Sequence, residues 1–173
     1  MDNTTLTRLL NLHPITREAF HGVFAFDTVP IKIRHKPWAI IFNEDTSNKS
    51  GSHWIAAFCP AEGAGEYFDT RGFPPHIKGS KIFKLMGTNC VYNSLLVQNP
   101  LTSVCGQHCL YFIFQRCKGV EFKNILSVYN LANTLQNDEN INTFVEQTFH
   151  TDQDVLDLGF LKQQISRQLN NTN

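Results

Sequence analysis

Four side chains of the kinds used in nucleophilic catalysis follow one another along this chain at defined spacings. His53 opens an apolar run, Asp69 closes the next one, and Gln98 lies seven residues before the pair Cys105 and Gly106. A thiol, an imidazole, a carboxylate that orients the imidazole and an amide donor are the groups needed to attack a carbonyl carbon and stabilise the oxyanion. The order excludes a papain-like arrangement, in which the cysteine comes first. The set predicts a thiol-dependent hydrolase.

Two short β-rich runs are expected to bring the histidine and the aspartate together. The first begins at His53 and the second ends at Asp69, and the segment 60–65 between them contains proline and two glycines. An antiparallel hairpin centred near Ala61 or Glu62 would place the carboxylate beside the imidazole. Such a carboxylate holds the ring in one tautomer and stabilises its protonated form.

A helix is expected to begin at the cysteine. The segment before it contains Pro100, which is typical of a loop, and residues 105–117 are apolar on nearly all faces and are followed by Lys118 and Gly119. In the first turn, the unpaired backbone amides and the positive end of the helix dipole favour the Cys105 thiolate. Gln98 lies upstream on the loop, where its amide could face an oxyanion together with the Cys105 backbone N–H.

The ordered motifs resemble those of the adenain-like cysteine proteases, the family of the adenovirus maturation protease. They are most similar to the proteases of Polinton/Maverick elements and related viruses and virophages, over roughly residues 16 to 149. The segments that carry the resemblance are Gly51–Trp54, Glu66–Pro75, Gln98–Cys109, Phe20–Pro30, Ala39–Asn43 and Asn137–Asp138. The resemblance implies an α+β fold: a small, mostly antiparallel or mixed sheet packed with helices, with the catalytic cysteine at the start of a buried central helix.

The resemblance also implies an activity and a setting. It implies that His53, Asp69 and Cys105 act as a catalytic triad with Gln98 as oxyanion donor. Trp54 and Gly106 would contact the substrate, since the tryptophan roofs a narrow channel for glycine-rich segments in these families. The expected substrates are capsid or core precursor polypeptides, cleaved at glycine-containing sites during particle maturation. No cofactor is required, a monomer is expected, and the expected location is the virion or the host nucleus or cytoplasm.

One rival function is a protease that removes ubiquitin-like modifiers. Asp69 does not separate the two activities, because those enzymes carry aspartate where adenovirus enzymes carry glutamate. A glutamine seven residues before the cysteine is adenain-like, whereas the modifier proteases usually have six. A non-catalytic binding module is the more distant alternative, and the complete set of four residues argues against it.

The resemblance gives only partial grounds to expect an activator. The adenovirus enzyme is stimulated by DNA and by a viral peptide disulfide-linked to a cysteine upstream of the catalytic glutamine. Here the one cysteine in that stretch is Cys90, in an apolar run that favours a strand residue instead. Lys78, Lys81 and Lys84 offer a small basic patch, so at most a weak association with DNA is expected.

Composition fits one small enzyme domain over residues 1–173. The formal charge is +0, which gives no general signature of polyanion binding, while 14 phenylalanines supply a core. No apolar stretch is long enough to span a membrane, and the first residues lack the features of a signal peptide, so secretion is not expected. Five cysteines without a secretion signal predict reduced thiols. Cys105, His108 and Cys109 share a helix face, but no second cluster of ligands accompanies them, so a metal site is not expected.

The remaining chain predicts short elements on either side of these motifs. The expected helices cover residues 5–12, 16–21, 122–131, 138–149 and 154–169. The expected strands cover residues 23–26, 30–33, 38–42, 55–58, 66–68 and 90–92, and the tail 170–173 is expected to fray.

Overall fold

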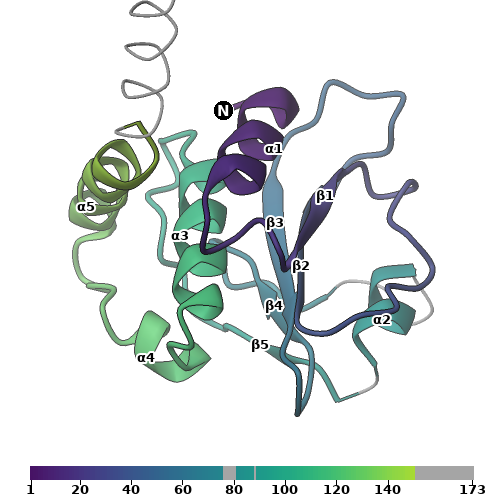
Figure 1. Cartoon of the computed structure of the whole chain (residues 1–173). Helices are drawn as coiled ribbons and strands as arrows, with labels where there is room; N and C mark the ends of the chain where they lie inside the picture. The colour runs from purple at the N-terminus through teal and green to yellow at the C-terminus, as the bar shows by residue number, and fades with distance from the viewer. Residues whose placement is uncertain (76–80, 88, 151–173) are drawn as a thin grey trace, which may run out of the picture.

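A five-stranded mixed sheet forms the centre of the computed structural model, which describes residues 1–75, 81–87 and 89–150 (Figure 1). The strands lie side by side in chain order. Neighbours β1–β2 and β4–β5 are parallel, and β2–β3 and β3–β4 are antiparallel. The strands are β1 Phe20–Phe24, β2 Trp38–Asn43, β3 Trp54–Cys59, β4 Glu66–Phe68 and β5 Val91–Tyr92.

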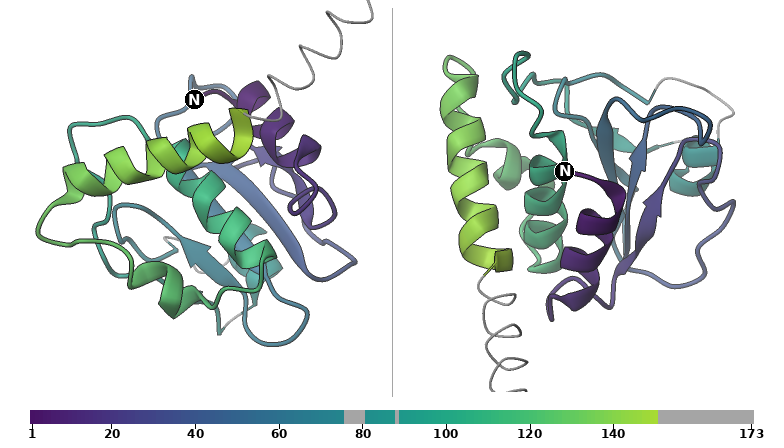
Figure 2. Two further views of the ribbon diagram at one scale, coloured as in Figure 1. Left: turned by 60° about the vertical axis from the view of Figure 1, so that its left-hand side comes forward. Right: turned by 90° about the horizontal axis from the view of Figure 1, so that it is seen from above.

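The helices lie on both faces of the sheet, as Figure 2 shows in the view from above. On one face α3 packs against β3, α1 lies beside it, and α5 packs on the outer side of α3. On the other face lies the short helix α2. The helices are α1 Asn3–Leu12, α2 Lys81–Met86, α3 Cys105–Cys117, α4 Phe122–Leu126 and α5 Thr134–Val145, which continues into the π-helical turn Glu146–His150.

The central strands are buried on both faces, so they supply two hydrophobic clusters. In β2, Ala39 and Ile41 join the cluster under α1 and α3, whereas Ile40 and Phe42 join the cluster on the side of α2. This alternation is the period of two that a strand imposes on its side chains. α3 is fixed on the sheet by stacking of Phe112 on Phe68, with ring centroids 4.8 Å apart. The start of α3 is therefore held in a set position relative to the end of β4.

The predicted α+β fold is confirmed, and the elements nearest the candidate site occur where the sequence places them. The predicted strand 66–68 is observed with the same bounds, and 38–42, 55–58 and 90–92 are observed within one residue at each end. The helix at residues 105–117 has the predicted bounds.

Three predictions near the N-terminus differ from the structure. The predicted helix over residues 16–21 is absent: residues 16–19 form turns, and Phe20 pairs with Ala39 in the sheet and so begins β1. A segment of six residues makes too few helical hydrogen bonds to resist that pairing. The strand predicted at 23–26 is shifted towards the N-terminus and becomes β1, which lies beside β2. Residues 30–33 accordingly form no strand.

The later helices differ mainly in their bounds. The helix predicted over 122–131 ends at Leu126, and Tyr129 beyond it turns inward to His108. α5 begins at Thr134 rather than at residue 138, because the Asn133 side chain caps it by accepting from the Gln136 backbone N–H. Helix α2 was not predicted. The predicted helix 154–169 and the tail 170–173 lie outside the described residues.

In the part of the chain that the structure describes, no helix has the length and apolar character needed to cross a membrane.

Candidate active site

His53 and Asp69 meet at the open ends of β3 and β4. The strands pair with Ala56 opposite Phe68 and Phe58 opposite Glu66. This register corresponds to a hairpin centred on residue 62, as predicted, and makes the two residues diagonal neighbours rather than directly opposite ones. Diagonal neighbours lie within reach of long side chains. His53 Nε2 lies 2.7 Å from Asp69 Oδ1, and both side chains are buried.

The carboxylate of Asp69 is held by groups that the spacing of the motifs does not reveal. Its Oδ1 also accepts the backbone N–H of Arg71, at 2.9 Å. The buried side chain of Asn93 accepts from the Asp69 backbone N–H and donates to the Asp69 carbonyl. Asn93 lies just after β5, next to β4 in the sheet but 24 residues away in the chain. Only the parallel pairing of these strands brings it to Asp69.

Cys105 is the first residue of α3 and lies against His53. Because His53 Nε2 faces Asp69, its other ring nitrogen, Nδ1, is left for the hydrogen bond between the imidazole and the thiol. Burial opposes the thiolate, but the hydrogen bond to His53 and the backbone N–H groups of Trp54 and Gly106 outweigh it and lower the pKa of Cys105. A helix start also favours a thiolate.

The pKa of His53 is shifted in the opposite direction. Burial alone would lower it, but the hydrogen bonds to Asp69 and Cys105 and the charge of Asp69 raise it to about 9. The pKa of Asp69 is lowered despite its burial, because it pairs with His53 and accepts from Arg71. The raised histidine pKa and the lowered cysteine pKa both favour the thiolate–imidazolium form of the pair over the neutral form.

Gln98 lies in the loop before α3, where two threonines fix its carboxamide. The Thr70 hydroxyl donates to Oε1 at 2.8 Å, and Nε2 donates to the Thr102 carbonyl at 2.9 Å. Since a carbonyl can only accept, Nε2 must be the atom that faces Thr102. Nε2 also lies 3.4 Å from the Thr102 hydroxyl oxygen, and Gln98 lines the cavity that contains Cys105.

Trp54 and Gly106 approach each other closely beside the nucleophile. A Cβ added to Gly106 would lie 3.4 Å from Trp54 Cδ1 and 3.3 Å from Met1 Cβ. The indole N–H of Trp54 donates to the Met1 carbonyl at 3.0 Å, which fixes the ring plane. Gly106 is buried, so the absence of a side chain lets the start of α3 pack directly against Trp54, Met1 and Leu6.

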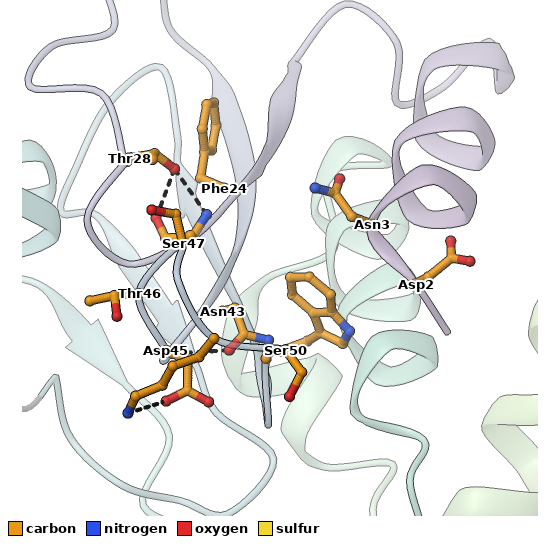
Figure 3. A pocket seen from close by; sticks show the side chains of 13 residues that line it. Asp2, Asn3, Phe24, Thr28, Asn43, Asp45, Thr46, Ser47 and Ser50 are labelled. Carbon is orange, nitrogen blue, oxygen red and sulfur yellow. Dashed lines mark hydrogen bonds and ion pairs between the residues drawn. The ribbon is translucent and has the colours of Figure 1, made fainter.

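Two cavities open beside these residues. One of about 260 Å³ contains the predicted nucleophile, base and amide together: its lining includes His53, Gln98 and Cys105 as well as Ser52, Arg71 and Leu96. A second, of about 470 Å³, begins at Trp54 and extends between the start of α1 and the loop that follows β2 (Figure 3). In Figure 3, Asp2 and Asn3 lie across this cavity from Thr28 and Ser47.

The cysteines and histidines elsewhere on α3 have structural surroundings. Cys109 is fully buried in the core, and both ring nitrogens of His108 are engaged, by Tyr129 and Asp138. Residues 1–75, 81–87 and 89–150 contain no group of three or more His, Cys, Asp or Glu side chains that could hold a metal ion. All five cysteines are free thiols.

Comparison with known proteins identifies a similar fold but no sequence family. No protein family model matches the chain, and a search of curated proteins also gives no match. The crystal structure of the ASFV pS273R protease superimposes with a TM-score of 0.55 at 16% identity, covering 79% of this chain and 64% of that one. A selenomethionine crystal structure of the same protease gives 0.44 at 21% identity, with 61% and 43% covered.

The fold is therefore that of a viral cysteine protease, with Cys105 at the start of the central helix. This chain spans less than two thirds of the length of the pS273R protease that it matches.

Proposed function

We propose that this protein is a cysteine endopeptidase of the adenain-like type. The observation that carries the proposal is the chain of contacts from Asp69 through His53 to Cys105, with the pKa of the imidazole raised and that of the thiol lowered. Buried structural ion pairs also shift pKa values, but here the shifts occur in a cavity that contains an amide donor as well. The similarity in fold to a viral cysteine protease supports the same functional assignment.

In the proposed reaction the Cys105 thiolate attacks the scissile carbonyl carbon and His53 gives its proton to the leaving amine. The carbonyl oxygen becomes an oxyanion, which the Gln98 amide and the Cys105 backbone N–H stabilise. Water then attacks the thioester while the neutral His53 accepts its proton, and the tetrahedral intermediate collapses to release the acid product and restore the thiolate–imidazolium pair. Asp69 keeps the ring in the orientation that faces the sulfur throughout.

The proposed cleavage site follows glycine in short precursor segments. The support is the position of Trp54 beside the nucleophile, whose thiolate its backbone N–H stabilises, because the tryptophan roofs a narrow channel for glycine-rich segments in the families that the motifs resemble. Together with the resemblance to adenain-like proteases, this favours capsid or core precursors as substrates. No cofactor is needed for these steps, since every group that moves a proton belongs to the chain.

Substrate choice between the two candidate activities can be tested directly. The purified protein is incubated with peptides of the apolar-x-Gly type and, separately, with conjugates of ubiquitin-like modifiers. We expect cleavage of the peptides on the carboxyl side of glycine, measured by mass spectrometry, and little release of modifiers. Preferential release of modifiers would favour the rival protease, and no cleavage in either arm would contradict the enzyme assignment.

Replacing Gln98 by alanine is expected to lower kcat by about 100-fold or more and to leave KM nearly unchanged, because an oxyanion donor acts mainly in the transition state. Steady-state kinetics on a glycine-type peptide measures both constants. Gln115→Ala, near the other end of α3, is the matched control and should behave as wild type. A loss confined to KM would make Gln98 a substrate contact instead.

The enzyme is expected to work without a disulfide-linked peptide. Cys90 is half-buried beside β5, packs against the cluster on the α2 side of the sheet, and has a pKa raised by burial, so its thiol is poorly placed for exchange. Cys90→Ser should change the cleavage rate by less than about threefold. An enzyme that stays silent until a cysteine-bearing peptide is added, and that Cys90→Ser keeps silent, would show the opposite.

DNA is proposed to bind weakly at most. Of the three lysines in the basic patch, Lys81 donates to the Asp27 carbonyl and Lys78 lies outside the described residues. Any stimulation by DNA should therefore be modest and should vanish as salt is raised.

A further inference from the structure

A second buried polar network lies behind the candidate active site. Asp138, on α5, is 2% exposed, and its Oδ1 accepts from His108 Nε2 at 2.9 Å. His108 is fully buried on α3, three residues after Cys105, and its Nδ1 lies 3.1 Å from the Tyr129 hydroxyl. The carboxylate is thus attached to the helix that carries the nucleophile.

The other oxygen of the same carboxylate holds the loop that carries Gln98. Asp138 Oδ2 accepts from the Asn99 backbone N–H at 3.1 Å and from the Thr102 hydroxyl at 2.6 Å. The Thr102 carbonyl in turn accepts from Gln98 Nε2. The buried Asp138 side chain therefore joins two parts of the site. One hydrogen bond ties it to His108 on α3, the helix that begins at Cys105, and another ties it to Thr102, the residue that orients the Gln98 amide.

The residue before Asp138 holds the loop from its other end. Asn137 is also buried, and its Nδ2 donates to the Val97 carbonyl at 2.9 Å and to the Asn130 carbonyl at 3.0 Å. Its Oδ1 accepts from the Asn130 backbone N–H. The loop is consequently tied to α5 immediately before and immediately after Gln98.

We propose that Asp138 is a positioning residue for the oxyanion site: its carboxylate sets the loop bearing Gln98 at a fixed place relative to Cys105. This rests on the proposed function. A buried carboxylate shared by three donors suits the task, because a charged acceptor makes stronger hydrogen bonds than a neutral one and its loss would release both the loop and His108. Asp138 touches neither the nucleophile nor the amide, so it acts only through Thr102, Asn99 and His108.

The test compares Asp138→Asn with Glu139→Gln, an exposed neighbour on the same helix. Asparagine keeps the shape but has no charge and replaces one acceptor oxygen by an N–H donor, so the hydrogen bonds to the loop and to His108 are weakened or reversed. We expect kcat on a glycine-type peptide to fall by about 10- to 100-fold with KM nearly unchanged, as for a weakened oxyanion donor. Glu139→Gln should retain wild-type kinetics.

Alkylation of Cys105 by iodoacetamide separates positioning from general damage. This reaction displaces iodide and forms no oxyanion, so its rate reports the thiolate alone. In Asp138→Asn the alkylation rate of Cys105, followed by peptide mass spectrometry, should stay within about twofold of wild type while kcat falls. Equal losses in alkylation and kcat would overturn the proposal, since the whole site would then be disturbed.

A double mutant tests whether Asp138 acts through Gln98. In a Gln98→Ala background, adding Asp138→Asn should lower kcat by less than about threefold, because the group that it positions is already gone. If instead the fall in kcat of the double mutant equals the product of the falls in the two single mutants, the proposal is overturned. If Asp138→Asn fails to fold, Thr102→Val removes the hydroxyl through which the carboxylate holds Asn99 and Gln98, and it should give the same pattern.

The result also distinguishes this role from the proposed function. A wild-type protein that cleaves, with Asp138→Asn and Thr102→Val kinetically like Glu139→Gln, would overturn the positioning role alone. A wild-type protein that does not cleave at all would overturn the proposed function and the positioning role with it.

Discussion

Replacing Cys105 by alanine is expected to lower peptide cleavage by about 10⁴-fold or more, because the thiol is the one nucleophile of the proposed reaction. The side chain is small and only half-buried, so the free energy of unfolding should change by about 1 kcal/mol or less. Kinetics on a glycine-type peptide and thermal unfolding measure the two effects separately.

Cys117→Ala is the matched control, since this half-buried thiol ends the same helix and contacts no residue of the candidate site. The control should cleave at the wild-type rate. Cleavage by Cys105→Ala at a rate near wild type would end the assignment as a cysteine protease.

Replacing Asp69 by asparagine is expected to have the next largest effect, a loss of about 10³- to 10⁴-fold in kcat. The amide carries no charge to stabilise the imidazolium, and it no longer fixes the tautomer that presents Nδ1 to the thiol. Asp69→Glu should lose less, because it keeps the carboxylate. Equal activity of the two variants would contradict the orienting role of Asp69.

The pH dependence should follow from the same contact. In the wild type, cleavage should decline on the alkaline side as His53 loses its proton near pH 9. The Asp69 carboxylate raises the pKa of His53, so its removal lowers that pKa and should move the alkaline decline of any residual activity to lower pH. A pH–rate profile of Asp69→Asn with an unmoved alkaline limb would argue against the pairing.

The parts of the site that sequence predicts are those set by local patterns. A hairpin symmetric about residue 62 carries His53 and Asp69, and the stretch after Pro100 carries the helix start at Cys105. Both depend on short-range signals: alternating apolar residues, glycine and proline in the turn, and an apolar run bounded by a loop. The central strands and α3 were predicted for the same reason.

The roles of the supporting residues could not be predicted, although Asn137–Asp138 is among the segments that carry the resemblance, because their partners are distant in sequence. Asn93 reaches Asp69 only through the pairing of β5 with β4, and Asp138 reaches Asn99 across 39 residues. The helix predicted at residues 16–21 was wrong for a related reason: pairing of Phe20 with β2 outweighs a weak local preference. Residues that meet only through such long-range contacts have no characteristic spacing along the chain, so a single sequence does not show that they are partners.

The most direct test of the central claim is covalent capture of the nucleophile. The protein is incubated with a short peptide whose C-terminal glycine carries a thiol-reactive electrophile, and the intact mass and the labelled peptide are measured. The proposed mechanism predicts one adduct per chain, on Cys105, formed much more slowly in His53→Ala. No adduct, or labelling spread over Cys90 and Cys117 at a rate that His53→Ala does not change, would contradict it.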